Sequence, residues 1–265
     1  MRFSDLLDAA RSNPLNVTIP ADWAQGRATF GGLVAALQYE ALRARVPADR
    51  PLRSLAITFV GPVAPDVPAR YEVQVLREGK AVSQLLGRVV QNGEVMTLMQ
   101  ASFGASRPSE INVVAEPAPT FKHWDECQEL PYIKGVTPEF MGHLAMRWSV
   151  GGLPFTANKS REMGGWVRLR GDVKEEPLTE AYILALVDAW PPALLPHLSK
   201  PAPGSTLTWT IEFVQPLQDL TTLDWCQYHV QIEHARDGYG HAAAALWSPH
   251  GQLIALSRQT VVVFA

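Results

Sequence analysis

The 265-residue sequence has little cysteine, little net charge and no long hydrophobic run. Its two cysteines, Cys127 and Cys226, are too few for a disulfide framework, so we expect both to be reduced thiols. The 23 basic and 26 acidic residues leave a formal charge of -3, which gives no basic surface for nucleic acid. Apolar runs such as 253–256 are far shorter than the roughly 20 residues that span a bilayer. We therefore predict neither a nucleic-acid nor a membrane partner.

Signals for export and for several common enzyme classes are also missing. Asp5 and Asp8 fall where a secretory signal peptide needs an uncharged core, so we expect a cytoplasmic protein. The sequence has no Gly-x-Ser-x-Gly elbow, no phosphate-binding Gly-x-x-x-x-Gly-Lys-Ser/Thr loop and no His-Glu-x-x-His pair. No two of the seven histidines have the helical spacing of metal ligands. We expect no metal and no cofactor, and neither cysteine is a strong nucleophile candidate.

One pattern of a short strand, a helix and several antiparallel strands occurs twice. The first copy is predicted to contain a strand at 16–19, a helix at 33–42 and strands at 52–60, 71–77, 81–91 and 95–103. The second is predicted to contain a strand at 166–169, a helix at 180–190 and strands at 206–214, 225–233, 239–247 and 252–264. Matching residues lie 150 to 159 positions apart: Val17 with Val167, Phe59 with Phe213, Pro62 with Pro216, Gly79 with Gly238, and Gly93 with Gly251. We interpret this as an internal duplication.

Each predicted helix is apolar nearly all round and must be covered on most sides. A strongly curved antiparallel sheet wrapped round one helix provides that cover. The predicted fold class is therefore α+β, with two tandem hotdog domains. Proline-rich sequence between the copies is typical of a linker lying over the surface. The expected organisation is an N-terminal hotdog domain at 1–106, a linker at 107–140 and a C-terminal hotdog domain at 141–265.

Several stretches in this order resemble the type II acyl-CoA thioesterases, which carry two hotdog domains in one chain. They are Phe30-Gly31-Gly32, Leu186-Val187-Asp188, the segment 205–213 with Pro216, and the segment 251–259. The resemblance covers nearly the whole chain. It implies a thioester hydrolase that takes acyl-CoA as its substrate. It also implies that Asp188, Thr206 and Gln259 hold one water for direct attack on the thioester.

Asp188 stands out from the residues alone. It follows four apolar residues of the predicted second helix, and buried aspartates are rare unless they are hydrogen-bonded. An acid near a helix C-terminus also opposes the helix dipole, so it has no stability rationale there. A carboxylate in such a place can act as a general base toward water. The alternative is a surface aspartate that faces solvent.

The other two residues are less distinctive. Thr206 begins its predicted strand on the same face as Thr208 and Thr210, so composition could not choose among the three. Gln259 lies on an otherwise largely apolar face of the last strand, and its amide can both donate to and accept from its neighbours. The alternative for Gln259 is a core glutamine tied to the backbone.

The glycine pair before the first helix is a candidate oxyanion site. Free N–H groups at a helix N-terminus suit a developing oxyanion, so Gly31 or Gly32 could donate to it, and the helix start near Glu180 is the competing source. The repeat places Gln38 opposite Asp188 and Leu52 opposite Thr206. Gln259 falls opposite Gln100 or Ala101, depending on one gap. The first copy thus lacks the trio, which predicts one hydrolytic site per chain.

Two other functions stay open at this point. One is a hydratase or dehydratase of the same fold, although that chemistry usually draws on a histidine paired with an acid. The other is a protein that binds acyl-CoA without turnover. Basic residues that could contact the CoA phosphates are Arg27, Arg77, Lys80 and Arg258. Acyl chain length and oligomeric state are not determined by the sequence, and a homo-oligomer is feasible.

Overall fold

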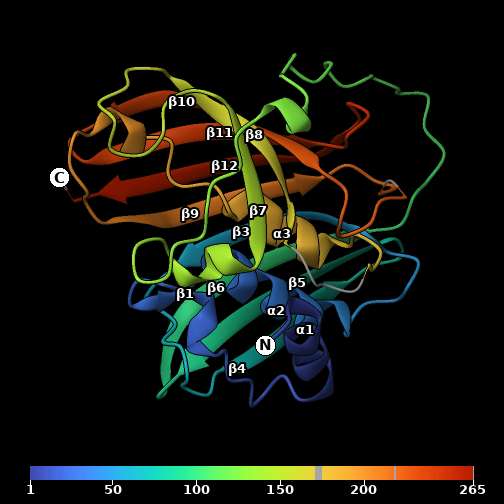
Figure 1. The fold of residues 1–265 in the computed structure, drawn as a ribbon. Coiled ribbons are helices and arrows are strands. Elements are labelled where there is room, and N and C mark those ends of the chain that lie inside the picture. The colour runs from blue at the N-terminus through green and yellow to red at the C-terminus, as the bar shows by residue number, and fades with distance from the viewer. Residues whose placement is uncertain (171–174, 218, 265) are drawn as a thin grey trace.

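The computed structural model describes residues 1–170, 175–217 and 219–264. A ten-stranded antiparallel sheet runs through the whole molecule and curves around two central helices (Figure 1). The helices are α1 (Phe3–Ser12), α2 (Gly31–Arg43) and α3 (Glu180–Asp188). The sheet contains, in chain order, β3 (Leu52–Phe59), β4 (Arg70–Glu78), β5 (Val82–Gln91), β6 (Glu94–Gly104), β7 (Leu144–Val150), β8 (Glu162–Leu169), β9 (Gly204–Phe213), β10 (Cys226–Arg236), β11 (Tyr239–Trp247) and β12 (Leu253–Val263). A separate two-stranded ribbon joins β1 (Ala24–Gln25) to β2 (Ala28–Thr29).

The strand order in the sheet is β4-β5-β6-β3-β9-β12-β11-β10-β8-β7. The four strands of the first repeat therefore form one half of the sheet, and the six of the second form the other. The two halves meet where β3 pairs with β9. No helix in the described ranges is long and apolar enough to cross a membrane.

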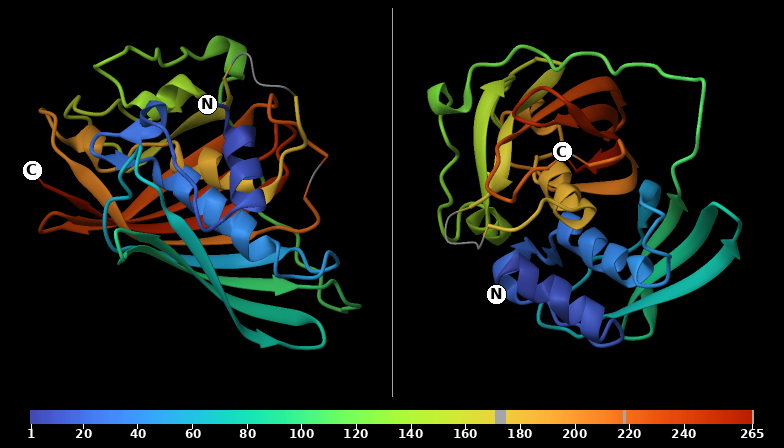
Figure 2. Two further views of the ribbon diagram at one scale, coloured as in Figure 1. Left: turned by 90° about the horizontal axis from the view of Figure 1, so that it is seen from below. Right: turned by 90° about the vertical axis from the view of Figure 1, so that its right-hand side faces the viewer.

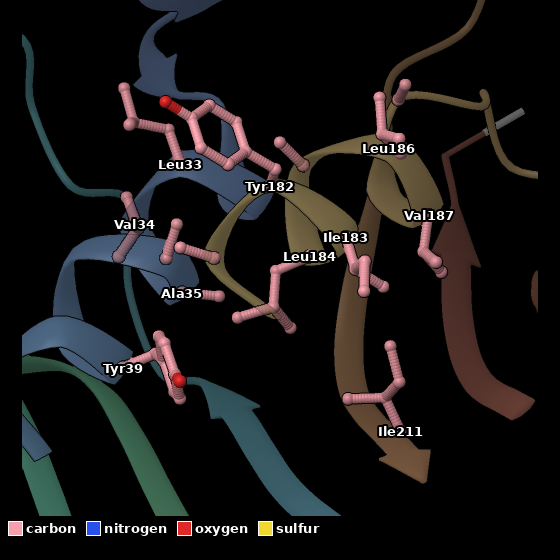
Figure 3. Close-up of a cluster of buried hydrophobic side chains, with 14 of the residues drawn as sticks. Leu33, Val34, Ala35, Tyr39, Tyr182, Ile183, Leu184, Leu186, Val187 and Ile211 are labelled. Atoms are coloured by element: carbon pink, nitrogen blue, oxygen red, sulfur yellow. The ribbon is translucent and has the colours of Figure 1, made fainter. Parts of the chain in front are cut away.

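Helices α2 and α3 lie side by side on the inner side of the sheet (Figure 2). Leu33, Val34 and Ala35 of α2 lie next to Ile183 and Leu184 of α3, and all five are buried (Figure 3). The close approach of the helices depends on Gly32, because a Cβ atom there would come within 3.0 Å of the Cα atom of Ala185. Burial all round explains why neither helix shows a polar face in the sequence.

The pairing of β3 with β9 has the symmetry that a duplication predicts. Ala56 pairs with Thr210, which is also its equivalent 154 positions later. On either side of this pair, Leu55 pairs with Ile211 and Ile57 pairs with Trp209. These two pairs exchange under the same shift, so a pseudo-twofold axis passes between Ala56 and Thr210. The expected tandem hotdog architecture is confirmed.

Some predicted elements were wrong or incomplete. The predicted strand at 16–19 is only a single bridge between Val17 and Ala69. Its equivalent in the second repeat is a full strand, where Val167 of β8 pairs with Cys226 of β10. The second central helix ends at Asp188 and not at 190, because Pro191 and Pro192 follow closely. Helix α1 and strand β7 were not predicted at all.

The proline-rich connection has almost no regular structure between β6 and β7. Its later part packs on the outer face of β8 and β10, where Trp124 and Cys127 join Trp166 and Trp225. Trp166 points outward while Val167 enters the main core, as the alternation along a strand requires. That part of the connection therefore packs as part of the second repeat. The domain boundaries at 106 and 140 remain a proposal.

Candidate active site

Asp188 is the last residue of α3 and faces the beginning of α2. Residues 181–187 of α3 are buried, whereas Asp188 keeps a partial opening to the surface. A Cβ atom added to Gly31 would lie 2.9 Å from Asp188 Oδ2, and one added to Gly32 would lie 3.0 Å from Asp188 Cβ. Only residues without a side chain therefore allow this contact. The two glycines bring the N-terminus of α2 directly against the carboxylate.

A chain of two hydrogen bonds joins the polar trio of Asp188, Gln259 and Thr206. Gln259 Nε2 donates to Asp188 Oδ1 at 3.2 Å. Thr206 Oγ1 donates to Gln259 Oε1 at 3.5 Å, a long contact. The threonine holds the amide oxygen, so the amide NH2 group faces the carboxylate. The amide of Gln259 thus binds Asp188 Oδ1, while Asp188 Oδ2 lies beside Gly31.

The surroundings of Asp188 change its acidity strongly. Burial raises the pKa of its carboxyl from 3.8 to about 7, because the charged form loses its water. The hydrogen bond from Gln259 and the backbone amide of Gly32 act in the opposite direction, since both favour the charged form. A carboxylate whose pKa is close to neutral can take a proton from water and give it back. This is the property that a general base requires.

A β-bulge brings Thr206 into the trio. Thr208 pairs with Thr260, but Thr206 pairs with Val261, so β9 has one extra residue at this point. The bulge turns Thr206 to the inner face, which it shares with Gln259. The predicted common face of Thr206, Thr208 and Thr210 is therefore wrong. Thr208 is exposed on the outer face, whereas Thr206 is half-buried beside Gln259.

The two predicted sources of oxyanion donors are well separated. Gly31 and Gly32 touch Asp188, whereas Glu180 begins α3 at the end opposite to Asp188, about 12 Å away along the helix. The Glu180 carboxylate accepts hydrogen bonds from Tyr39 Oη at 3.0 Å and from Gln215 Nε2 at 2.9 Å. The beginning of α3 is thus tied to α2 and to the chain after β9.

The first repeat has no equivalent of the trio. Gln259 pairs with Trp209, and the pair related to it by symmetry is Ala101 with Leu55. Ala101, not Gln100, is therefore the counterpart of Gln259, and it is fully buried. Gln38, the counterpart of Asp188, is also buried, and its Nε2 atom donates to the carbonyl of Glu72.

Two aromatic residues near Asp188 were not singled out in the sequence. The ring of Phe59 comes within 3.2 Å of the position that a Gly31 Cβ atom would occupy. Tyr228 is buried and stacks on Trp190, and burial together with the charge of Asp188 raises the pKa of its phenol. Both come from strands distant in sequence from Asp188. Periodicity could place them on the inner face but could not bring them to this carboxylate.

The remaining candidate residues lie elsewhere. Both cysteines are free and buried, and burial raises the pKa of the Cys226 thiol to about 12, so it is a poor nucleophile. Arg258, a candidate for the CoA phosphates, is paired with Glu233. The described residues hold no cluster of three or more side chains that could bind a metal ion.

Family profiles identify the family of this chain, and solved structures share its fold. A profile of the acyl-CoA thioesterase C-terminal domain matches residues 124–263, and one of the N-terminal domain matches residues 19–104. Acyl-CoA thioesterase 2 of Haemophilus influenzae is 27% identical over 253 residues, which cover 88% of this chain and 86% of that protein. A hotdog-fold protein of Alicyclobacillus acidocaldarius superposes with a TM-score of 0.81 at 23% identity, covering 94% of this chain and 92% of that one. A tesB protein of Mycobacterium avium subs paratuberculosis superposes with a TM-score of 0.77 at 16% identity, covering 99% and 100%.

Proposed function

Because the chain belongs to the acyl-CoA thioesterase family, a family of enzymes, we propose that it hydrolyses a fatty acyl-CoA to the free acid and CoA. One observation carries the proposal. A carboxylate with a pKa of about 7 is held by an amide and stands against the N-terminus of a helix. Each part of that arrangement has a use in thioester hydrolysis. The base is Asp188, and the helix start supplies donors for the oxyanion.

In the proposed reaction, a water molecule is held by Asp188, Gln259 and Thr206. Its oxygen attacks the thioester carbonyl carbon while Asp188 accepts one of its protons. The backbone N–H group of Gly31 stabilises the negative charge that forms on the carbonyl oxygen, because that of Gly32 already faces Asp188. The tetrahedral intermediate then collapses, the carbon–sulfur bond breaks, and the proton on Asp188 passes to the CoA sulfur. No covalent acyl-enzyme is required.

The two alternatives fit the site less well. A hydratase or dehydratase would be expected to pair its acid with an imidazole, but Asp188 is paired with the amide of Gln259. A protein that only binds acyl-CoA would have no use for a carboxylate near pKa 7. Burying such a group costs free energy, so its presence favours turnover over binding alone.

The direct test is release of CoA thiol from a panel of straight-chain acyl-CoAs of increasing length. Asp188→Asn keeps the size of the side chain but cannot accept the proton, so we expect its kcat to fall at least 100-fold. Thr206→Val is expected to lower kcat about tenfold. The matched control is Thr208→Val, which changes an exposed threonine two residues away on the outer face and is expected to stay within twofold.

Two outcomes would overturn this proposal. If no acyl-CoA is cleaved but one is bound tightly, the protein binds its ligand without hydrolysing it. If cleavage persists in Asp188→Asn, another residue is the base. The cytoplasmic location and the possible homo-oligomer stay predictions from the sequence.

A further inference from the structure

Phe59 is an aromatic residue of the first repeat that reaches the site formed by the second. It ends β3 and is half-buried, so part of its ring is open. Its Cζ and Cε1 atoms lie 3.2 and 3.3 Å from the position of a Cβ atom on Gly31, and Asp188 Oδ2 lies 2.9 Å from the same position. The ring edge and the carboxylate oxygen are therefore at most about 6 Å apart. The ring of Phe59 and the carboxylate of Asp188 thus both border Gly31.

A reacting thioester falls within the same range of distances from the carboxylate. A water held by the carboxylate lies about 2.8 Å from it, and the carbon that it attacks lies about 3 Å further away. The reacting carbonyl carbon and the ring of Phe59 therefore share the same upper limit, about 6 Å, on their distance from Asp188. Gly31 closes the space between them on the α2 side, because even one added carbon atom would not fit there. A substrate carbon next to that carbonyl would then contact the ring of Phe59.

We propose that Phe59 determines specificity by excluding acyl groups that branch at the carbon next to the thioester carbonyl. A straight chain presents only a CH2 group at this position, whereas a 2-methyl group adds a carbon where the ring edge and Gly31 leave no space. The substrates would then be straight-chain acyl-CoAs. This inference rests on the proposed thioesterase activity.

The test compares acyl-CoA isomers of equal carbon number, one straight and one with a 2-methyl branch, so that total hydrophobicity stays constant. We expect the unmodified protein to favour the straight isomer in kcat/KM by at least tenfold. Phe59→Leu removes the ring edge and should shift the ratio toward the branched isomer by about tenfold, the range that one methyl group produces in an apolar site. Several chain lengths are needed, because the preferred length is not known.

The chain offers a matched control and a variant of opposite effect. Phe213 is the equivalent of Phe59 in the second repeat, 154 positions later. Phe213→Leu should leave the ratio of kcat/KM between the straight and branched isomers within twofold of that of the unmodified protein. Phe59→Tyr adds a hydroxyl to Cζ, which is the ring atom closest to the space beside Gly31. A hydroxyl there would narrow the space beside Asp188 for both isomers, so kcat for both should fall at least tenfold.

The outcomes separate this inference from the activity on which it rests. A ratio unchanged in Phe59→Leu, in a protein that still cleaves both isomers, overturns the role of Phe59 and leaves the thioesterase proposal intact. An equal shift in Phe213→Leu also overturns it, because the effect would then be general loosening of the fold. If no isomer is cleaved by any form, the thioesterase proposal fails and the inference with it.

Discussion

Replacing Asp188 by asparagine should make the protein more stable at alkaline pH, although it removes activity. The folded protein holds the Asp188 proton more tightly than the unfolded chain does, because burial raises the pKa of the carboxyl from 3.8 to about 7. The stability associated with this group is therefore complete below about pH 4. This stability falls as the pH rises from about 4 to about 7, and above that pH the contribution of the group no longer changes.

The expected change in the free energy of unfolding follows from the shift in the Asp188 pKa. One pKa unit corresponds to about 1.4 kcal/mol, so a shift of this extent gives an upper limit of about 4 kcal/mol. The partial opening of the site to solvent reduces it, and we expect roughly 2 kcal/mol between pH 5 and pH 8. Asparagine cannot ionise and should not show this loss, except for what other groups contribute equally to both proteins.

The assay is urea unfolding of the unmodified protein and of Asp188→Asn at pH 5 and pH 8. The quantity of interest is the difference between the two proteins at each pH, in which shared titrations cancel. The reasoning is refuted if that difference is the same at both pH values. It is also refuted if the unmodified protein gains stability relative to the variant as the pH rises, because the Asp188 pKa would then be lowered by folding.

Three further variants test other contacts of the site. Gln259→Ala removes a donor that favours charged Asp188, so the pKa in the pH–rate profile should rise and kcat should fall; an unchanged profile would contradict the hydrogen bond. Gly31→Ala places a carbon 2.9 Å from Asp188 Oδ2, so thiol release should fall at least tenfold, and full activity would show that the helix start can move. Tyr39→Phe removes a hydrogen bond to Glu180 and should cost about 1–2 kcal/mol in urea unfolding without changing kcat; lost activity at unchanged stability would contradict a purely structural role.

Local signals were enough to predict most of the sheet and both central helices. Asn92 and Gly93 both have positive φ in the hairpin between β5 and β6, as the dipeptide indicates. Asp237 and Gly238 do the same between β10 and β11. Because such turns and the alternation of strands are short-range features, the duplication was visible in the sequence.

Long-range contacts were not predictable in the same way. The bulge that turns Thr206 inward depends on the register of β9 against β12, and Thr208 is an equally good candidate in sequence. Helix α1 is amphipathic and packs on α2. Its sequence is short and rich in polar residues, so the helix was not recognised from the sequence. Phe59 reaches Asp188 only because the two repeats pack together.

The central claim is that Asp188 takes the proton of the attacking water. Its most direct test is the pH dependence of kcat/KM for a straight-chain acyl-CoA, measured from pH 5 to pH 9. The account predicts activity that rises with pH to a plateau, with a midpoint close to the Asp188 pKa of about 7, and a residual activity of Asp188→Asn without that midpoint. A profile that is flat across this range, or a midpoint that survives in Asp188→Asn, would contradict it.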